Sequence, residues 1–207
     1  MWSAVVPVKA TSTGKSRLAP PRGVPRQRLA LAMAIDTLAA VGGAVGFDHV
    51  VVVTDDEQVR ELAEGRGSRV VADPRLGLND AIRAGAAAVL ALPDGSTRAV
   101  AAVLGDLPSL RADDLVLALT NAAAHERAYV PDLAGTGTVL LTARAGVELL
   151  PRFGRRSAAL HREAATPLSG MPIRLRTDVD DQASLLRAIR LGCGPQTRAA
   201  LNEAHWT

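Results

Sequence analysis

Six basic residues precede the first acidic residue of the chain, and a cluster of this kind binds anions. They are Lys9, Lys15, Arg17, Arg22, Arg26 and Arg28, and the first acidic residue is Asp36. Such a cluster attracts either a nucleic acid or a nucleoside triphosphate. Stacking of bases from single strands normally uses aromatic side chains, and this segment contains only Trp2. We therefore expect a small phosphorylated ligand and no nucleic-acid partner.

The tripeptide Gly14-Lys15-Ser16 is half of a Walker phosphate-binding loop, but the other half is missing. The first glycine of that motif would stand five residues earlier, where the chain has Lys9. A Walker loop also runs directly into a helix, whereas Pro20-Pro21 follows here and disfavours helical geometry. This argues against a P-loop ATPase or kinase. Two interpretations remain: a basic loop that wraps a triphosphate, and a solvated basic loop.

Carboxylates that follow two predicted strands are the candidate metal ligands. Asp106 stands in "VLGDLPSL", and Asp113 is the better cap for the helix that follows. Asp178 and Asp180 stand in "TDVDD" at the end of a predicted final strand, where residues i and i+2 point to the same face. Together these three are the kind of carboxylate set that holds Mg²⁺ on a triphosphate. The alternative is that Asp180 or Asp181 only caps the last helix.

Two loops rich in small residues are candidates for a second anion site. "AGTGTVLL" places Gly135 to Thr138 around the start of a strand and leaves backbone amides approachable. "FGRRSAALH" places Gly154 and Ser157 at the start of a predicted helix. His161 lies one turn after Ser157 and is either a packed residue or a substrate contact. Two anion sites in opposite halves of the chain indicate two phosphorylated substrates.

Two further polar pairs stand at predicted helix starts. Asp55 and Asp56 fit capping and stabilisation of the helix dipole. Asn79 and Asp80 begin the next helix in "DPRLGLNDAI", where capping and contact with a nucleotide remain alternatives.

The elements that must position these residues follow an alternating pattern. Short β-branched runs alternate with Ala- and Leu-rich segments, which is typical of βαβ units around a parallel sheet. The predicted strands are Ala4–Val8, His49–Thr54, Ser68–Ala72, Ala99–Leu104, Ala128–Leu133, Thr138–Ala143 and Pro172–Val179. The predicted helices are Pro25–Val41, Asp56–Gly65, Leu78–Leu92, Ala112–His125, Ser157–Ala165 and Asp181–Leu191. The strands are continuous apolar runs, so both faces of the sheet should be covered.

This architecture brings the candidate residues to one edge of the sheet. In open α/β sheets, ligands bind beyond the C-terminal ends of the strands. Asp106 ends the fourth strand at that edge. The residues expected to contact the nucleotide there are Pro7, Lys9, Lys15, Arg17 and Asn79. We expect one domain over residues 1–191 and a loose tail over residues 192–207.

Composition places the chain among cytoplasmic globular proteins. Its 207 residues are 48% hydrophobic, 22% charged and 2% aromatic, with a net charge of +3. The single cysteine, Cys193, excludes an internal disulfide framework and suits a reducing compartment. No secretory leader opens the sequence, and no apolar run approaches the roughly 18 residues of a membrane span. We expect no membrane partner.

Taken in order, the motifs resemble a known family. Over residues 5–186 the chain is similar to the 2-phospholactate/phosphoenolpyruvate guanylyltransferases, which make a guanylylated precursor of the deazaflavin coenzyme F-420. The motifs on which this rests are "VPVKATSTGKSRLA", "VVTDD", "ADPRLGLNDAI", "VLGDLPSL", "GTGTVLL", "FGRRSAALH" and "TDVDD". The set in order is specific, although no single motif is.

The resemblance implies a fold, two substrates and a metal. The fold would be a single-domain, Rossmann-like nucleotidyltransferase fold of the α/β class, a mainly parallel mixed sheet with helices on both faces. The phosphoenolpyruvate phosphate would be held by Thr138, Gly154 and Ser157. The triphosphate of GTP would lie near Lys9, Lys15 and Arg17, and Mg²⁺ would lie at Asp106, Asp178 and Asp180.

The reaction that this implies is attack of a phosphate oxygen of the small acid on the α-phosphorus of GTP. Pyrophosphate leaves, stabilised by Lys15 and Arg17, with Asp106 as the metal-binding catalytic residue. A phosphate monoester is already ionised near neutral pH, so no dedicated general base is needed. Phosphoenolpyruvate is favoured over 2-phospholactate as acceptor. The alternatives are another acceptor or base, and a nucleotide-binding regulatory module that performs no transfer; the three retained aspartates argue against the latter.

Overall fold

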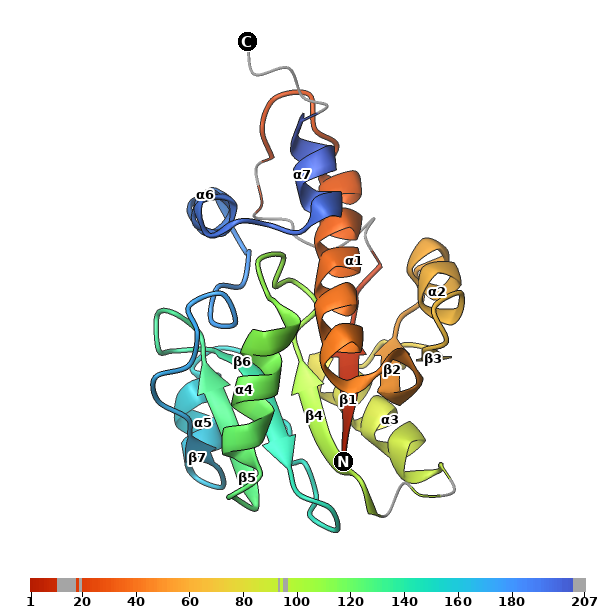
Figure 1. Cartoon of the computed structure of the whole chain (residues 1–207), viewed down its shortest axis with the longest axis vertical. Helices are drawn as coiled ribbons and strands as arrows, with labels where there is room; N and C mark the ends of the chain where they lie inside the picture. The colour runs from red at the N-terminus through yellow and green to blue at the C-terminus, as the bar shows by residue number, and fades with distance from the viewer. Residues whose placement is uncertain (11–17, 19, 93, 95–96, 203–207) are drawn as a thin grey trace.

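In the part of the chain that the structure describes, seven strands form one sheet with helices around it (Figure 1). The structure is a computed structural model, and it describes residues 1–10, 18, 20–92, 94 and 97–202. The strands are β1 (Trp2–Pro7), β2 (Val50–Val53), β3 (Arg69–Val71), β4 (Ala99–Val103), β5 (Arg127–Pro131), β6 (Thr138–Ala143) and β7 (Thr166–Pro167). The helices are α1 (Arg26–Val45), α2 (Glu57–Glu64), α3 (Leu78–Leu90), α4 (Ala112–Ala122), α5 (Ser157–Arg162), α6 (Gln182–Leu191) and α7 (Pro195–Asn202), and a 3-10 turn, η1 (Phe47–His49), precedes β2.

The strand order is β3-β2-β1-β4-β6-β5-β7. Strand β6 runs antiparallel to both of its neighbours, β4 and β5. The other neighbouring pairs are parallel. The sheet is therefore mixed and mainly parallel, and the prediction of this fold class is confirmed.

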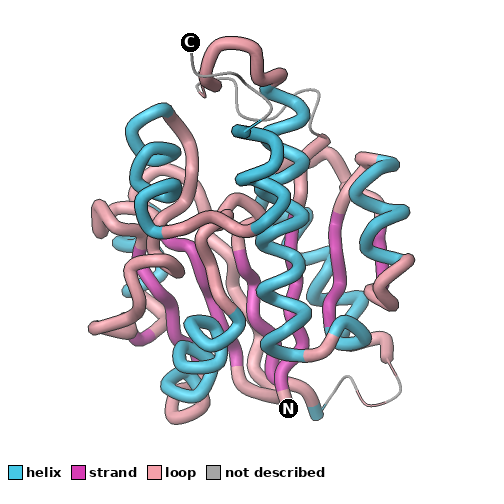
Figure 2. Tube along the Cα trace, turned by 45° about the horizontal axis from the view of Figure 1, so that its top comes forward, coloured by secondary structure: helices cyan, strands magenta, loops and turns pink. Residues whose placement is uncertain are grey.

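Successive residues of the central strands pack on opposite sides of the sheet. Ala4 and Val6 of β1 belong to the core that α1, α2 and α4 form on one face, and Val5 belongs to the core formed with α3 and α5 on the other. Figure 2 shows the strands, in magenta, between the helices of these two layers. Every residue of β2 and β4 is buried. Burial on both faces is why these strands read as continuous apolar runs in the sequence.

Helix α1 corrects one expectation, because it is long and apolar enough to cross a membrane by length and composition. The prediction that no segment approaches those properties is wrong for this helix. In the structure, however, 61% of its apolar window is buried. It packs against the sheet, α4 and α7, so its apolar character is that of a core helix.

The segment predicted as a final strand, Pro172–Val179, contains a turn at residues 173–176 and no strand, so that prediction is wrong. Two main-chain hydrogen bonds connect it to residues that follow β4 and β5. The main-chain N–H of Val179 donates to the carbonyl of Asp106 (3.1 Å), and that of Leu133 donates to the carbonyl of Arg176 (2.8 Å).

The C-terminal residues also differ from the expected loose tail, because residues 195–202 form helix α7 beside α1 (Figure 1). The buried carboxylate of Asp36 in α1 accepts hydrogen bonds from the main-chain N–H groups of Gln196 (3.1 Å) and Thr197 (2.7 Å). Asp36 therefore caps a helix that begins 159 positions later in the chain. The division into a domain and a tail at residue 191 stays a prediction.

Candidate active site

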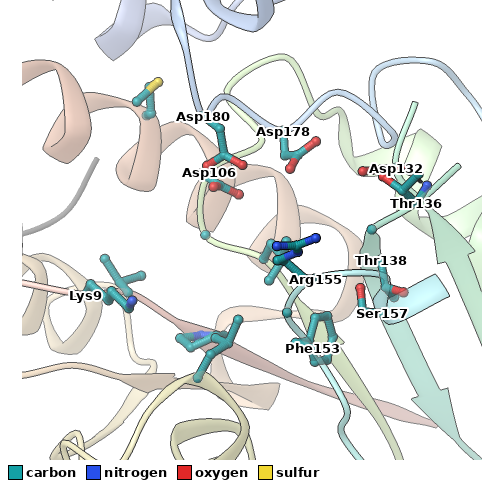
Figure 3. Close-up of a pocket in the computed structure, with 18 of the residues that line it drawn as sticks. Lys9, Asp106, Asp132, Thr136, Thr138, Phe153, Arg155, Ser157, Asp178 and Asp180 are labelled. Carbon is teal, nitrogen blue, oxygen red and sulfur yellow. Dashed lines mark hydrogen bonds between the residues drawn. The ribbon is translucent and has the colours of Figure 1, made fainter. Parts of the chain in front are cut away.

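Except for Asn79, the candidate residues that the structure describes meet at one edge of the sheet, around a cavity of about 880 Å³ (Figure 3). Strands β1 and β4 end there, and Pro7, Lys9 and Asp106 follow or close these strands. Strand β6 is antiparallel, so Thr138 at its start lies at the same edge. The edge matches the prediction made for ligands of open α/β sheets.

Three carboxylates form one end of the cavity. Asp106, Asp178 and Asp180 point toward the same space in Figure 3. The hydrogen bond between Val179 and the carbonyl of Asp106 fixes the 178–180 segment beside the end of β4. The predicted grouping is thus present, although a turn produces it rather than the predicted strand. Asp181 is the residue that caps α6, because its carboxylate accepts from the N–H of Ser184 (2.8 Å).

The three carboxylates at this end of the cavity repel one another. Burial raises the pKa of Asp178 to about 7, and the neighbouring charges of Asp106 and Asp180 add to the effect. A divalent cation between these carboxylates would relieve the repulsion. Among the described residues, no group of three or more His, Cys, Asp or Glu is close enough to hold a metal by itself. Oxygen donors of this kind suit a divalent cation that takes one or two carboxylates and completes its shell with phosphate oxygens and water.

Close packing beneath Asp106 explains the glycine before it. A Cβ atom at Gly105 would lie 2.8 Å from the carbonyl oxygen of Pro7, so a larger residue would separate the ends of β4 and β1. Helix α1 supports Leu107, the residue after Asp106, because the hydroxyl of Thr37 accepts from the main-chain N–H of Leu107 (3.0 Å). The predicted cap Asp113 does not act as one; Asp114 accepts from the N–H of Arg111 instead.

The opposite end of the cavity is lined by hydroxyl groups, arginines and a glycine. Thr138 of β6 and Ser157 of α5 lie next to each other there, and the side chain of Arg155 lies between them and the carboxylates (Figure 3). Gly154 has a φ of 131°, which side-chain-bearing residues rarely adopt. These are the residues expected to hold the acceptor. Helix α5 has only six residues, so the hydroxyls and arginines matter more here than a helix dipole.

His161 lies beneath this wall and is buried, with 2% of its surface exposed. Its Nε2 accepts from the main-chain N–H of Arg152 (2.9 Å), and its Nδ1 lies 2.9 Å from the hydroxyl of Thr138. Burial lowers the pKa of His161 to about 4, and the positive charge of Arg152 contributes. Of the two alternatives for this residue, the structure favours a packed, neutral histidine.

Asn79 is neither a helix cap nor turned to the cavity. Its amide donates to the carbonyl of Phe153 (3.0 Å) and accepts from the N–H of the same residue (2.7 Å). Helix α3 has no side-chain cap. Asp56 does cap its helix, by accepting from the N–H of Val59 (3.3 Å), as expected. The pKa of Asp55 is lowered by a hydrogen bond from Arg75.

Sequence comparisons agree with this geometry. Residues 26–192 match the model of the MobA-like NTP transferase domain. A phosphoenolpyruvate guanylyltransferase of Salinispora arenicola is 45% identical over 205 residues, which cover 95% of this chain and 92% of the relative. The chain belongs to the phosphoenolpyruvate guanylyltransferase family. It is therefore a nucleotidyltransferase, and the resemblance inferred from the motifs is confirmed.

Solved structures share the guanylyltransferase's fold. A nucleotidyl transferase from Methanothermobacter superposes with a TM-score of 0.58 at 22% identity, covering 92% of this chain and 98% of that one. Rv0371c from Mycobacterium tuberculosis, solved as a complex with manganese, superposes with a TM-score of 0.57 at 18% identity, covering 92% and 99%. At these identities the likeness concerns the fold alone.

The predicted residues and the residues that line the cavity of this guanylyltransferase do not fully coincide. Lys15 and Arg17, predicted as catalytic, lie outside the described residues. Sequence reasoning missed Asp132, Arg155 and Arg156, which line the cavity. Asp132 follows the end of β5 as Asp106 follows β4, so its place after a strand was an available signal. The two arginines stand between Gly154 and Ser157 in the motif "FGRRSAALH", and their positive charge beside a predicted anion site was the available signal.

Proposed function

We propose that the protein transfers GMP from GTP to phosphoenolpyruvate and releases pyrophosphate. The product would be enolpyruvyl-diphospho-guanosine, a precursor of coenzyme F-420 in the family that the motifs resemble. The relatives named above support this acceptor over 2-phospholactate. The single buried cysteine, Cys193, supports a reducing, cytoplasmic setting.

The observation that supports the proposal most is the two-ended cavity. One end has the facing carboxylates of Asp106, Asp178 and Asp180, and the other has Thr138 and Ser157. Two anionic substrates bound at these ends would have their reacting groups between them. Holding both reactants in one cavity converts a bimolecular reaction between anions into a step within one complex.

In the proposed step, an oxygen of the acceptor's phosphate forms a bond to the α-phosphorus of GTP. The bond from that phosphorus to the bridging oxygen of the β-phosphate breaks, and pyrophosphate leaves with the electron pair. The acceptor oxygen is ionised near neutral pH, so no proton has to be removed from it. Residues of the chain therefore contribute position and charge.

Asp106, Asp178 and Asp180 are the candidate ligands of Mg²⁺, of which one or two would bind the ion together with phosphate oxygens of the substrates. When bound, the ion supplies neutralisation of the phosphate oxygens and of the leaving group. Lys9, at the exit of β1, lines the cavity and would bind the triphosphate together with Lys15 and Arg17. For the last two residues the assignment rests on the sequence.

A pyrophosphate-release assay tests the proposal. The four ribonucleoside triphosphates would be combined with phosphoenolpyruvate or 2-phospholactate, with and without Mg²⁺. We expect release only with GTP, phosphoenolpyruvate and Mg²⁺ together. No release with any pair would refute the transferase, and release with 2-phospholactate alone would refute only the acceptor.

The Asp106→Asn variant tests the metal assignment. We expect kcat to fall by about a hundredfold or more, since charge neutralisation at the reacting phosphates is lost. The far-UV circular dichroism should stay unchanged, because the asparagine keeps the shape of the side chain. Asp114→Asn, at the start of α4 and away from the cavity, is the matched control. Wild-type turnover by Asp106→Asn would show that the metal lies elsewhere.

A further inference from the structure

Residues 150–157, which we call the acceptor loop, include the wall of the cavity beside Thr138, which residues 153–157 form. The loop contains Gly154 and ends at Ser157, the two residues assigned above to the acceptor. Residues 151–153 belong to no helix or strand. Ladder or helix hydrogen bonds therefore do not fix their position, and side chains from other elements must do so.

Asn79 of helix α3 holds two consecutive peptide groups of this loop from outside, because the N–H of Phe153 belongs to the 152–153 peptide and its C=O to the 153–154 peptide. It pairs with both the N–H and the C=O of Phe153, at 2.7 and 3.0 Å, across 74 residues of sequence. Both polar ends of the amide are used in this pair, which resembles the pairing of two strand residues. Asn79 does not line the cavity. Its polar atoms are thus committed to the residue before Gly154.

His161 holds the preceding peptide group, through the N–H of Arg152, and also contacts the neighbouring hydroxyl of Thr138. A main-chain N–H can only donate, so Nε2 of His161 accepts from Arg152 and has no proton. The neutral ring then has its proton on Nδ1 and donates it to the hydroxyl oxygen of Thr138. The hydrogen of that hydroxyl is left to donate to an anionic oxygen in the cavity.

We propose that Asn79 and His161 are positioning residues of the acceptor subsite. Together they bond three consecutive peptide groups, from the N–H of Arg152 to the C=O of Phe153, and His161 sets the donor direction of Thr138. The ring of His161 also packs edge-on against Phe153, with centroids 5.0 Å apart. The inference rests on the proposed function, and it removes Asn79 from the expected nucleotide contacts.

Steady-state pyrophosphate release distinguishes the two roles of Asn79. The KM for phosphoenolpyruvate would be measured at saturating GTP, and the KM for GTP at saturating phosphoenolpyruvate. In Asn79→Asp the donor to the Phe153 carbonyl is lost, and we expect the KM for phosphoenolpyruvate to rise about tenfold. The KM for GTP should stay within twofold. Asn121→Asp, the same substitution at an exposed position of α4 outside the cavity lining, is the control and should change neither constant.

Two variants separate the bonds of His161. His161→Asn keeps a donor near Thr138, and His161→Gln keeps an acceptor for Arg152. Each should raise the KM for phosphoenolpyruvate less than His161→Phe, which keeps the packing and removes both bonds. Leu160→Ala, at an adjacent exposed position, is the control. Urea unfolding midpoints would exclude variants that are unfolded under assay conditions. If His161→Phe is unfolded, Thr138→Val, which removes only the hydroxyl, should show the same selective rise.

The outcomes are distinguishable. An active wild type whose Asn79 variant raises the KM for GTP instead would show a nucleotide contact and overturn the inference. Equal rises in both constants, or none, would overturn it as well and leave the transferase intact. A wild type without turnover on any substrate pair would overturn the proposed function and the inference with it.

Discussion

Acidification should destabilise this protein through His161. The buried ring accepts a hydrogen bond at Nε2 from a main-chain N–H, an interaction that only the neutral form can make. The charged group beside the ring is the guanidinium of Arg152, which is itself paired with Glu163. The aromatic ring of Tyr129 is also nearby. None of these supplies a negative charge directly to the ring, so protonation has no compensation in the folded state.

The magnitude follows from the pKa values. The pKa of His161 is about 4 in the folded protein, against 6.5 for the free side chain. Because the folded value is the lower one, the unfolded chain binds a proton first as the pH falls. Stability from this group is therefore complete above about pH 6.5 and is lost between pH 6.5 and 4. The full loss is about 3 kcal/mol, since each pH unit between the two values is worth about 1.4 kcal/mol.

Urea unfolding of the wild type and of His161→Gln, from pH 7.5 to 4, measures this loss. Glutamine does not titrate, so groups common to both proteins cancel in the difference of their unfolding free energies. We expect the wild-type advantage to shrink by about 3 kcal/mol as the pH falls. A constant difference would refute the account. Nuclear magnetic resonance gives an independent check: of the 4 histidines, the ring assigned to His161 should not titrate above pH 5.

Three further predictions concern the C-terminal helices and the acceptor loop. Asp36→Ala should lower the unfolding free energy by about 2 kcal/mol in urea titrations, because one buried and one part-buried N–H group of α7 lose their acceptor; an unchanged midpoint would contradict the capping role. Burial, with Asp36 nearby, raises the pKa of the Cys193 thiol to about 11, so a thiol reagent at pH 8 should label native protein far more slowly than protein in urea; equal rates would contradict its burial. Gly154→Ala should raise the KM for phosphoenolpyruvate and not that for GTP, since alanine rarely adopts φ 131°; equal effects on both substrates would place Gly154 outside the acceptor subsite.

Local patterns predicted the central sheet and half of the site. Continuous apolar runs located β1, β2 and β4, because strands covered on both faces cannot alternate. The position of Asp106 after such a run then placed it at the ligand edge. These inferences needed only residues close together in sequence, which is why they succeeded.

The misses share a physical cause, namely partners far away in the chain. Glycine and proline at 192–195 suggested a tail, but Asp36 caps the helix that follows. The capping alternative for Asn79 is wrong, since its partner Phe153 is 74 residues away. The segment Pro172–Val179, predicted as a strand, finds its hydrogen bonds beyond the ends of β4 and β5 instead. No local pattern encodes these contacts.

The direction of β6 is what allows one cavity to receive two anions. Its first residue, Thr138, lies at the edge where β1 and β4 end, because β6 is antiparallel to β4. A parallel strand of the same six residues would place Thr138 at the opposite edge, about 17 Å away at 3.3 Å per residue. The hydroxyl wall would then be out of reach of Asp106. The reversal of a single strand therefore places Thr138 at the same edge as Asp106, which follows the parallel strand β4, and so brings the proposed acceptor end and the carboxylate end into one cavity.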